Sequence, residues 1–359
     1  MDGTCTQEQS TPKVSEQITA ALGADGKFTY YPGMSFEIHK DSHMTTKYEF
    51  QEQVYQYADN VERLEHAFVI RAVLRLGTAT KAMILNYLHW QKRECPKKRI
   101  PLCDGDMQSN MRALTSILKK LCRKGLLISH DYVANVSADK KSVIVVYTGT
   151  IYGHTLYRNV LEEFMEFDMN SVFRADVASF RMLATNAVML QFAHYPETTE
   201  IYLNGRYGME KPYKKIKNHV FGLAIMEYQG KKQIFLAEPI FFRFNPEIRT
   251  DEQVLEYIED RLDKLAKIIG QIKEMDEDEP VVRIVYIVEN MAGLRHLNHM
   301  IRAEEENSDI FRNALFTSEN VVYTQEGNLD KSFLKLYYNE GKQILQFRPA
   351  FADWYKLSE

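Results

Sequence analysis

Residues 107–124 combine side chains that recognise DNA with the spacing of an amphipathic helix. One apolar stripe at intervals of three and four residues is formed by Met111, Leu114, Ile117, Leu118 and Leu121. Amide, hydroxyl and basic groups lie on the opposite side, from Gln108, Ser109, Arg112, Thr115, Ser116, Lys119 and Arg123. Amide, hydroxyl and guanidinium groups hydrogen-bond to base edges, and cationic groups bind phosphates. The pattern therefore predicts a DNA-contacting helix; an ordinary amphipathic surface helix is the alternative.

The neighbouring segments must position this helix. Asp106 can cap its first turn, and Gly125 can end it in the left-handed conformation. Before it, the sequence predicts an amphipathic helix over 61–76 and a second helix that begins after Thr80. After it come a strand at 126–136, a turn at 137–140 and a return strand at 142–147. Three helices followed by a hairpin predict a winged helix-turn-helix domain over 61–153, whose third helix enters the major groove.

Charge is unevenly distributed along the chain. Residues 61–150 hold 16 Lys and Arg against 7 Asp and Glu, a net charge of +9, whereas the whole chain carries −4. One basic region in a mildly acidic protein indicates contact with phosphates. We predict that bases are read by Gln108, Ser109, Arg112 and Ser116. We predict further contacts to DNA, mainly to phosphates, by Lys97, Lys98, Arg99, Lys119, Lys120, Arg123, Lys140 and Lys141.

The second half of the chain alternates strands and helices. The pattern predicts helices at 155–168, 176–194, 251–272 and 290–303, and strands at 219–228, 232–240, 281–288 and 320–324. Their order predicts a mixed sheet covered by helices, in an α/β domain over 154–330. Residues 1–60 are expected to be a partly disordered extension and 331–359 a C-terminal tail. The acidic run at 274–279 is expected to be a solvated loop.

The predicted winged helix, the segment Val146-Tyr-Thr-Gly-Thr-Ile-Tyr-Gly-His and the following domain resemble the replication-relaxation proteins over residues 61–325. The resemblance implies an α+β chain whose second domain is similar to restriction-endonuclease-like PD-(D/E)XK nucleases. It also implies an accessory role in the relaxosome of a plasmid or conjugative element, where the protein helps a relaxase during mobilisation.

The nuclease pattern is incomplete in this sequence. Such enzymes place an Asp on one strand and Glu-x-Lys on the next, so that two carboxylates hold the metal and the Lys steadies the attacking water. Here Asn218 precedes the first strand and Glu238 ends the second, without the lysine. We therefore expect a degenerate domain without catalytic residues, metal or cofactor. A metal-dependent nuclease centred on Glu238 is the alternative.

Other classes of protein lack support in the sequence. The pairs His39/His43 and His296/His299 have no further ligands nearby and are expected to be surface residues. There is no Gly-rich phosphate loop, no apolar segment of membrane-spanning length and no zinc-type cysteine spacing. We predict a cytoplasmic, non-enzymatic protein that binds double-stranded DNA in a sequence-specific manner. Its acidic C-terminal domain would recruit a relaxase or form a homo-oligomer, and a transcriptional regulator of a mobile element is the other alternative.

Overall fold

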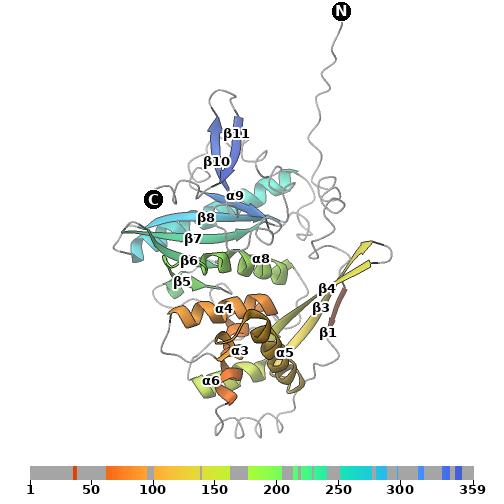
Figure 1. The fold of residues 1–359 in the computed structure, drawn as a ribbon. Coiled ribbons are helices and arrows are strands. Elements are labelled where there is room, and N and C mark those ends of the chain that lie inside the picture. The colour runs from red at the N-terminus through yellow and green to blue at the C-terminus, as the bar shows by residue number, and fades with distance from the viewer. Residues whose placement is uncertain are drawn as a thin grey trace, which may run out of the picture.

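The structure is a computed structural model of an α+β protein with two sheets (Figure 1). It describes residues 35–38, 62–94, 101–137, 140–161, 177–203, 213–216, 220–228, 230–240, 251–276, 280–288, 297, 314–318, 334–339 and 344–349. None of the helices within these ranges is long and apolar enough to cross a membrane.

The first sheet has four antiparallel strands in the order β1-β3-β4-β2. They are β1 (Ser35–Ile38), β2 (Thr78–Thr80), β3 (Leu127–Ser137) and β4 (Lys140–Gly149). Around them lie α3 (Glu62–Leu76), α4 (Lys81–Glu94), α5 (Met107–Arg123) and α6 (Ile151–Leu161). These elements confirm the three predicted helices up to residue 124 and the predicted hairpin after them. Thr80 caps α4, because its hydroxyl oxygen accepts a hydrogen bond from the Met83 amide at 3.4 Å.

The first strand was not predicted. β1 lies within residues 1–60, which were expected to be a partly disordered extension. It pairs antiparallel with β3, with Ser35 opposite Val133 and Ile38 opposite His130. A four-residue strand has little local signal, because its stability comes from the neighbouring strand that supplies its hydrogen bonds.

The second sheet has seven strands in the order β11-β10-β9-β8-β7-β6-β5. They are β5 (Thr198–Tyr202), β6 (Leu223–Tyr228), β7 (Lys231–Pro239), β8 (Val281–Val288), β9 (Leu315–Ser318), β10 (Leu334–Asn339) and β11 (Ile344–Pro349). β7, β8 and β9 are parallel and the outer pairs are antiparallel, so the predicted mixed sheet is confirmed.

Two expectations about this region differ from the structure. The proposed tail at 331–359 contains β10 and β11, which extend the sheet through pairing with β9. The α6 helix begins at Ile151 rather than at residue 155. The predicted strand at 320–324, and the helix at 290–303 except residue 297, lie outside the described residues.

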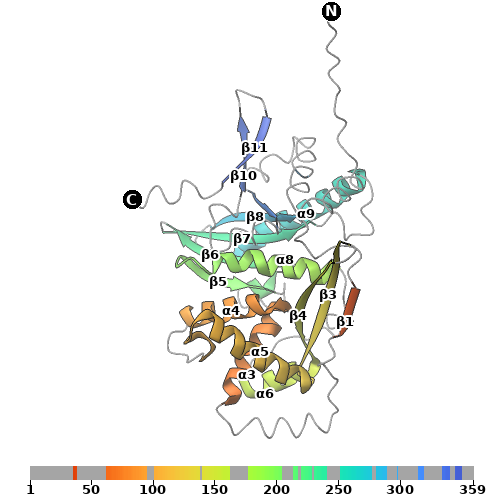
Figure 2. The ribbon, with the colours of Figure 1, turned by 45° about the vertical axis from the view of Figure 1, so that its right-hand side comes forward.

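Helices cover both faces of the seven-stranded sheet. α8 (Val177–Phe192) packs on the face that carries Phe235, Ala237 and Val285, whereas α9 (Asp251–Met275) packs on the face of Leu236 and Tyr286. Successive strand residues alternate between the two faces, as the pleat requires. Figure 2 shows α8 between this sheet and α4, with α9 on the far side.

One apolar core continues from the first sheet into the second. Leu76 and Leu118 belong to the same buried cluster as Leu183 and Phe235. Asn186 on α8 donates two hydrogen bonds of 2.8 Å to the carbonyls of Leu76 and Thr78. The Arg93 guanidinium at the end of α4 donates to the carbonyls that follow α8, at 2.8, 2.8 and 3.1 Å from Ala193, Tyr195 and Thr198. The regions on either side of residue 153 are therefore joined by packing and by buried hydrogen bonds.

Candidate nucleic-acid interface

Both ends of α5 have the expected caps. Asp106 accepts the amides of Gln108 and Ser109 at 2.9 and 3.0 Å, and it also accepts the Ser109 hydroxyl at 2.6 Å. Hydrogen bonds from the Ser109 hydroxyl and then from the backbone lower the pKa of Asp106, so its carboxylate is charged at neutral pH. At the other end, Gly125 has a φ of 67°, in the left-handed region, and its amide donates to the Cys122 carbonyl at 3.0 Å. The predicted caps are confirmed.

The inner face of α5 is fixed in the core. Leu114, Leu118 and Leu121 are fully buried, and Ile117 and Cys122 are nearly so. This packing determines which side of the helix points to solvent, because residues four apart share a face. Thr115, expected on the polar side, is partly buried and donates its hydroxyl to the Met111 carbonyl at 2.7 Å.

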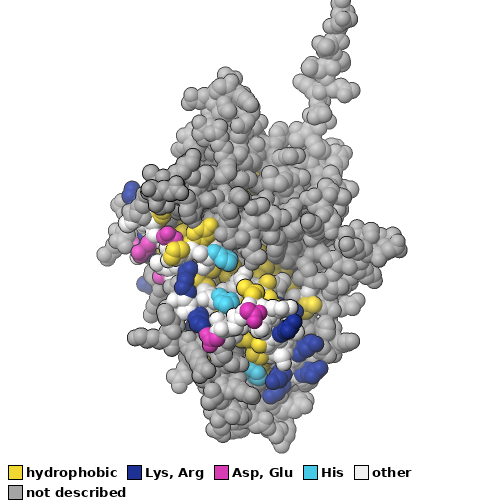
Figure 3. All heavy atoms as spheres, in the orientation of Figure 1, with side chains coloured by type: hydrophobic (Ala, Val, Ile, Leu, Met, Phe, Trp, Pro, Cys, Tyr) yellow, Lys and Arg dark blue, Asp and Glu magenta, His cyan; other side chains and the backbone are white. Residues whose placement is uncertain are grey.

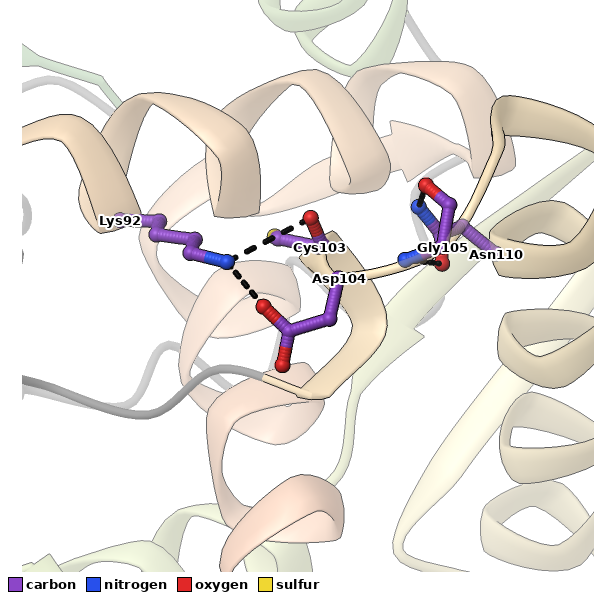
Figure 4. A network of polar contacts seen from close by, with 5 residues as sticks. All are labelled: Lys92, Cys103, Asp104, Gly105 and Asn110. Atoms are coloured by element: carbon purple, nitrogen blue, oxygen red, sulfur yellow. Dashed lines mark hydrogen bonds and ion pairs between the residues drawn. The ribbon is translucent and has the colours of Figure 1, made fainter.

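The loop before α5 is held by two sets of polar contacts (Figure 4). The buried Asn110 side chain donates to the Gly105 carbonyl at 2.8 Å and accepts the Gly105 amide at 3.3 Å. Lys92 on α4 forms an ion pair with Asp104 and donates to the Cys103 carbonyl at 3.5 Å. Burial raises the pKa of the Cys103 thiol to about 11, so this cysteine is protonated at neutral pH. The start of α5 is therefore positioned before any ligand binds.

The outer face of α5 exposes the predicted DNA-contacting residues. Exposed side chains on this helix are Gln108, Ser109, Arg112, Ser116, Lys119, Lys120 and Arg123. The Ser109 hydroxyl donates to Asp106, so its oxygen can serve a base only as an acceptor. Within the part of the chain that the structure describes, the side chains of Gln108, Arg112 and Ser116 form no hydrogen bond.

The basic groups on this face are not neutralised. α5 contains no Asp or Glu, and no described acidic side chain forms an ion pair with Arg112, Lys119, Lys120 or Arg123. Lysine and arginine side chains gather over α5 on the surface shown in Figure 3. Four unpaired cations along one helix create a positive potential that attracts a polyanion.

Lys81 is a further cation beside this face that sequence reasoning missed. It is the first residue of α4, and its Nζ lies 3.4 Å from the Thr115 Oγ1 on α5. Thr115 lies three and four residues from Arg112 and Lys119, so Lys81 adjoins that row. No local signal links residues 34 positions apart; the packing of α4 against α5 brings them together.

Five residues predicted to contact phosphates have side chains that the structure does not describe. Lys97, Lys98 and Arg99 lie outside the described residues. The backbone places Lys140 and Lys141 where β4 begins, opposite Ser137 and Asn135 at the turn end of the hairpin. Their side chains are outside the described part of the structure.

The second place where the sequence suggested chemistry is Glu238, at the end of β7. Its side chain is fully buried, and its two carboxylate oxygens accept hydrogen bonds from Arg261 on α9 at 2.8 and 2.7 Å. Burial disfavours the charged guanidinium, but hydrogen bonding and attraction to Glu238 outweigh it and raise the pKa of Arg261. This pairing opposes metal binding, since both oxygens are already engaged.

The remaining residues singled out in the sequence are the acidic run at 274–279, Asn218 and the two histidine pairs. The prediction that residues 274–279 form a solvated loop was wrong for Asp276. This residue is buried, forms a 2.6 Å ion pair with Lys232 and accepts a hydrogen bond from the Tyr213 hydroxyl at 3.2 Å. Asn218 and the histidine pairs at 39/43 and 296/299 lie outside the described residues. Within the described ranges, no three His, Cys, Asp or Glu side chains lie close enough to share a metal ion.

Comparisons of the chain with models of known protein families, with curated proteins and with solved structures find no match.

Proposed function

We propose that this protein binds double-stranded DNA through the exposed face of α5. The observation that carries the proposal is the set of four unpaired cations on a helix without acidic residues. A helix fits into the major groove, which is about 12 Å wide, and basic side chains on such a helix neutralise the phosphates at the groove edges. The buried inner face and the two caps keep these groups on one side of the molecule.

The order of elements supports a winged helix-turn-helix as the fold of this region. The short strand β2 lies between α3 and α4 and pairs with β4, so that it adds a strand to the hairpin that follows α5. In a domain of this kind α5 is the recognition helix, and the hairpin turn with Lys140 and Lys141 contacts the neighbouring backbone. The extra strand β1 extends the hairpin on its other edge.

The side chains divide into two groups in this proposal. Gln108, Arg112 and Ser116 read base edges, because amide, guanidinium and hydroxyl groups match the donors and acceptors of the major groove. Lys81, Lys119, Lys120 and Arg123 bind phosphates, which fixes the position of the helix without selecting a sequence.

The biological role follows from the resemblance to the replication-relaxation proteins. We propose an accessory protein of plasmid or conjugative-element mobilisation, in which the seven-stranded sheet and its helices contact a relaxase. The continuous core supports this division of labour, because it would hold a partner of the second sheet at a fixed position relative to the DNA. A DNA site at a promoter, without a relaxase partner, would instead indicate a transcriptional regulator.

The degenerate nuclease interpretation of the second region also remains a proposal. Glu238 gives no reason to propose cleavage, because Arg261 binds both of its carboxylate oxygens. Incubation of a selected duplex with Mg²⁺ or Mn²⁺ tests the alternative: cleavage that Glu238→Ala abolishes would establish a nuclease.

The DNA-binding proposal is tested by fluorescence anisotropy with the full chain and a random-sequence duplex. Between about 50 and 200 mM salt, binding should weaken linearly on logarithmic axes, and Lys119→Ala/Lys120→Ala should lower the slope by about 1.8, or 0.9 for each lost phosphate contact. The matched control is Lys267→Ala/Lys273→Ala, which removes two exposed lysines from α9 on the far side of the sheet. Equal slopes for the two double variants would refute the proposed face.

A further inference from the structure

Arg181 on α8 is a partly buried cation without an anionic partner among the residues that the structure describes. Its Nε is buried and forms no hydrogen bond, and it forms no ion pair with any acidic side chain that the structure describes. Removal of a guanidinium from water has a large free-energy cost unless hydrogen bonds and a counter-ion replace the lost hydration. This residue is therefore an exception that needs a physical explanation.

Two aromatic rings hold the Arg181 side chain in place. Its Cζ lies 5.9 Å from the centre of the Phe221 ring and 5.7 Å from that of Tyr257. Cation–π contacts of this kind contribute roughly 0.5–2 kcal/mol each and offset only part of the cost of burial. A guanidinium carries five N–H donors in a planar fork that can bind an oxyanion with two prongs.

Two described acids near this cluster already have basic partners. Arg261 lies over the same Phe221 ring at 5.7 Å, but its charge is matched by Glu238. Asp260, the other nearby acid, forms an ion pair with Lys264. Among the acidic side chains that the structure describes, none forms an ion pair with Arg181.

The position of this cluster also favours ligand binding. Glu238 marks the carboxyl end of β7, which is parallel to β8, and Phe221 comes just before the adjacent strand β6. Ligands of α/β sheets bind outside the carboxyl ends of parallel strands. Burial first, and then the charge of Glu238, raise the pKa of Tyr257, so its hydroxyl stays protonated and can donate a hydrogen bond.

We propose that Arg181 and Tyr257 form a phosphate-binding site at this end of the seven-stranded sheet. Arg181 supplies the charge and the edge of its guanidinium, Tyr257 supplies a hydroxyl donor, and the Glu238–Arg261 pair holds the neighbouring wall in place. The phosphate group belongs either to the backbone of bound DNA or to a free phosphate or phosphomonoester. The site is separate from α5 and does not depend on the function proposed for that helix.

Inorganic phosphate is the probe for the first test, with the full chain and ionic strength held constant with chloride. At a concentration about tenfold above its Kd, phosphate should raise the Tm of the wild type by about 2 °C. Arg181→Met should abolish this rise and Tyr257→Phe should reduce it. Lys267→Met, which removes an exposed lysine from α9, is the control and should retain it.

The same variants separate a binding role from a purely structural one. If Arg181 only packed against the rings, Arg181→Met would lower the Tm in chloride alone. We expect an unchanged or higher Tm in chloride, because the substitution removes an unpaired cation and keeps apolar contact with both rings. A phosphate-dependent rise of equal size in wild type and Arg181→Met would overturn the proposal.

Duplex DNA distinguishes the two sources of the phosphate group. If the site binds the DNA backbone, Arg181→Met should also lower the salt slope of duplex binding by about 0.9. An unchanged slope together with loss of the Tm rise would assign the site to a free phosphate or phosphomonoester. No phosphate-dependent Tm rise in the wild type and no change of slope in Arg181→Met would overturn the site, even where the α5 variants lose DNA binding.

Discussion

Arg261 binds both carboxylate oxygens of Glu238, with distances of 2.8 Å from its Nε and 2.7 Å from its Nη2. The exposed fractions of the two side chains are 11% and 1%. The one carboxylate that the sequence suggested for metal chemistry is thus a buried partner in an ion pair that joins α9 to the sheet.

Loss of either partner of this pair should destabilise the fold. Glu238→Gln and Arg261→Met each leave the other group buried without its partner, and each should lower the free energy of unfolding by about 3–5 kcal/mol. The double variant Glu238→Gln/Arg261→Met should cost less than the sum of the two, because no buried charge remains unpaired. Urea unfolding measures all three; additive losses would show that the two side chains do not stabilise each other.

The role proposed for Arg112 in base recognition predicts a loss that depends on DNA sequence. Arg112→Ala should weaken binding to a selected duplex by about 1–3 kcal/mol, and binding to random sequence by less. Lys119→Ala, in contrast, should weaken both by the same factor, since a phosphate contact carries no sequence information. Anisotropy titrations with the two duplexes provide the comparison. Equal losses on both duplexes for Arg112→Ala would place this arginine on the backbone instead.

The oxygens of Asp106 cap α5, and in the proposed complex its negative charge would oppose DNA binding. Asp106→Asn retains an oxygen that accepts the amides of the first turn, so the Tm should remain close to that of the wild type. Its affinity for duplex DNA should rise, because a charge next to the basic face is removed. Asp106→Ala removes the cap as well and should lower the Tm. Unchanged affinity for Asp106→Asn would show that the charge is not near the DNA, and a fall would contradict the prediction.

The buried histidine on β3 predicts a loss of stability in mild acid. Burial lowers the pKa of His130 to about 4, whereas an unfolded histidine has a pKa of about 6.5. The unfolded chain therefore binds the proton first as the pH falls, and His130 should reduce the free energy of unfolding by about 2 kcal/mol between pH 7.5 and pH 5. Urea unfolding at the two pH values should show a smaller fall in His130→Gln than in the wild type. A fall of the same size in both proteins would assign the acid sensitivity to other groups.

The features predicted correctly from the sequence are those with local causes. Asp106, Gly125 and the apolar stripe of α5 act within one or two helical turns, so their pattern indicates the helix, its two ends and its outer face. The hairpin of β6 and β7 is another local feature, because an apolar strand lies on either side of Gly230 in the sequence.

The features that were missed depend on residues distant in the chain. Lys81 reaches Thr115 and Arg261 reaches Glu238 only after helices pack, and neither pair has a sequence signal. Asp276 resembles its solvated acidic neighbours until Lys232 and Tyr213 meet it in the fold. The antiparallel pair β10 and β11 does have a local signal, because polar and apolar residues alternate in part within 334–339 and 344–349 and a glycine, Gly341, lies between them in the sequence.

The hydrogen bonds of Arg93 and Asn186 have a consequence for how the chain comes apart. A fragment that ended at residue 153 would leave the Arg93 guanidinium without its three carbonyls, and it would expose the apolar surface that α8 covers. Such a fragment would be prone to aggregate rather than fold as an independent module. The two sheets should accordingly melt in a single cooperative transition, and a protease should find no stable limit product between them.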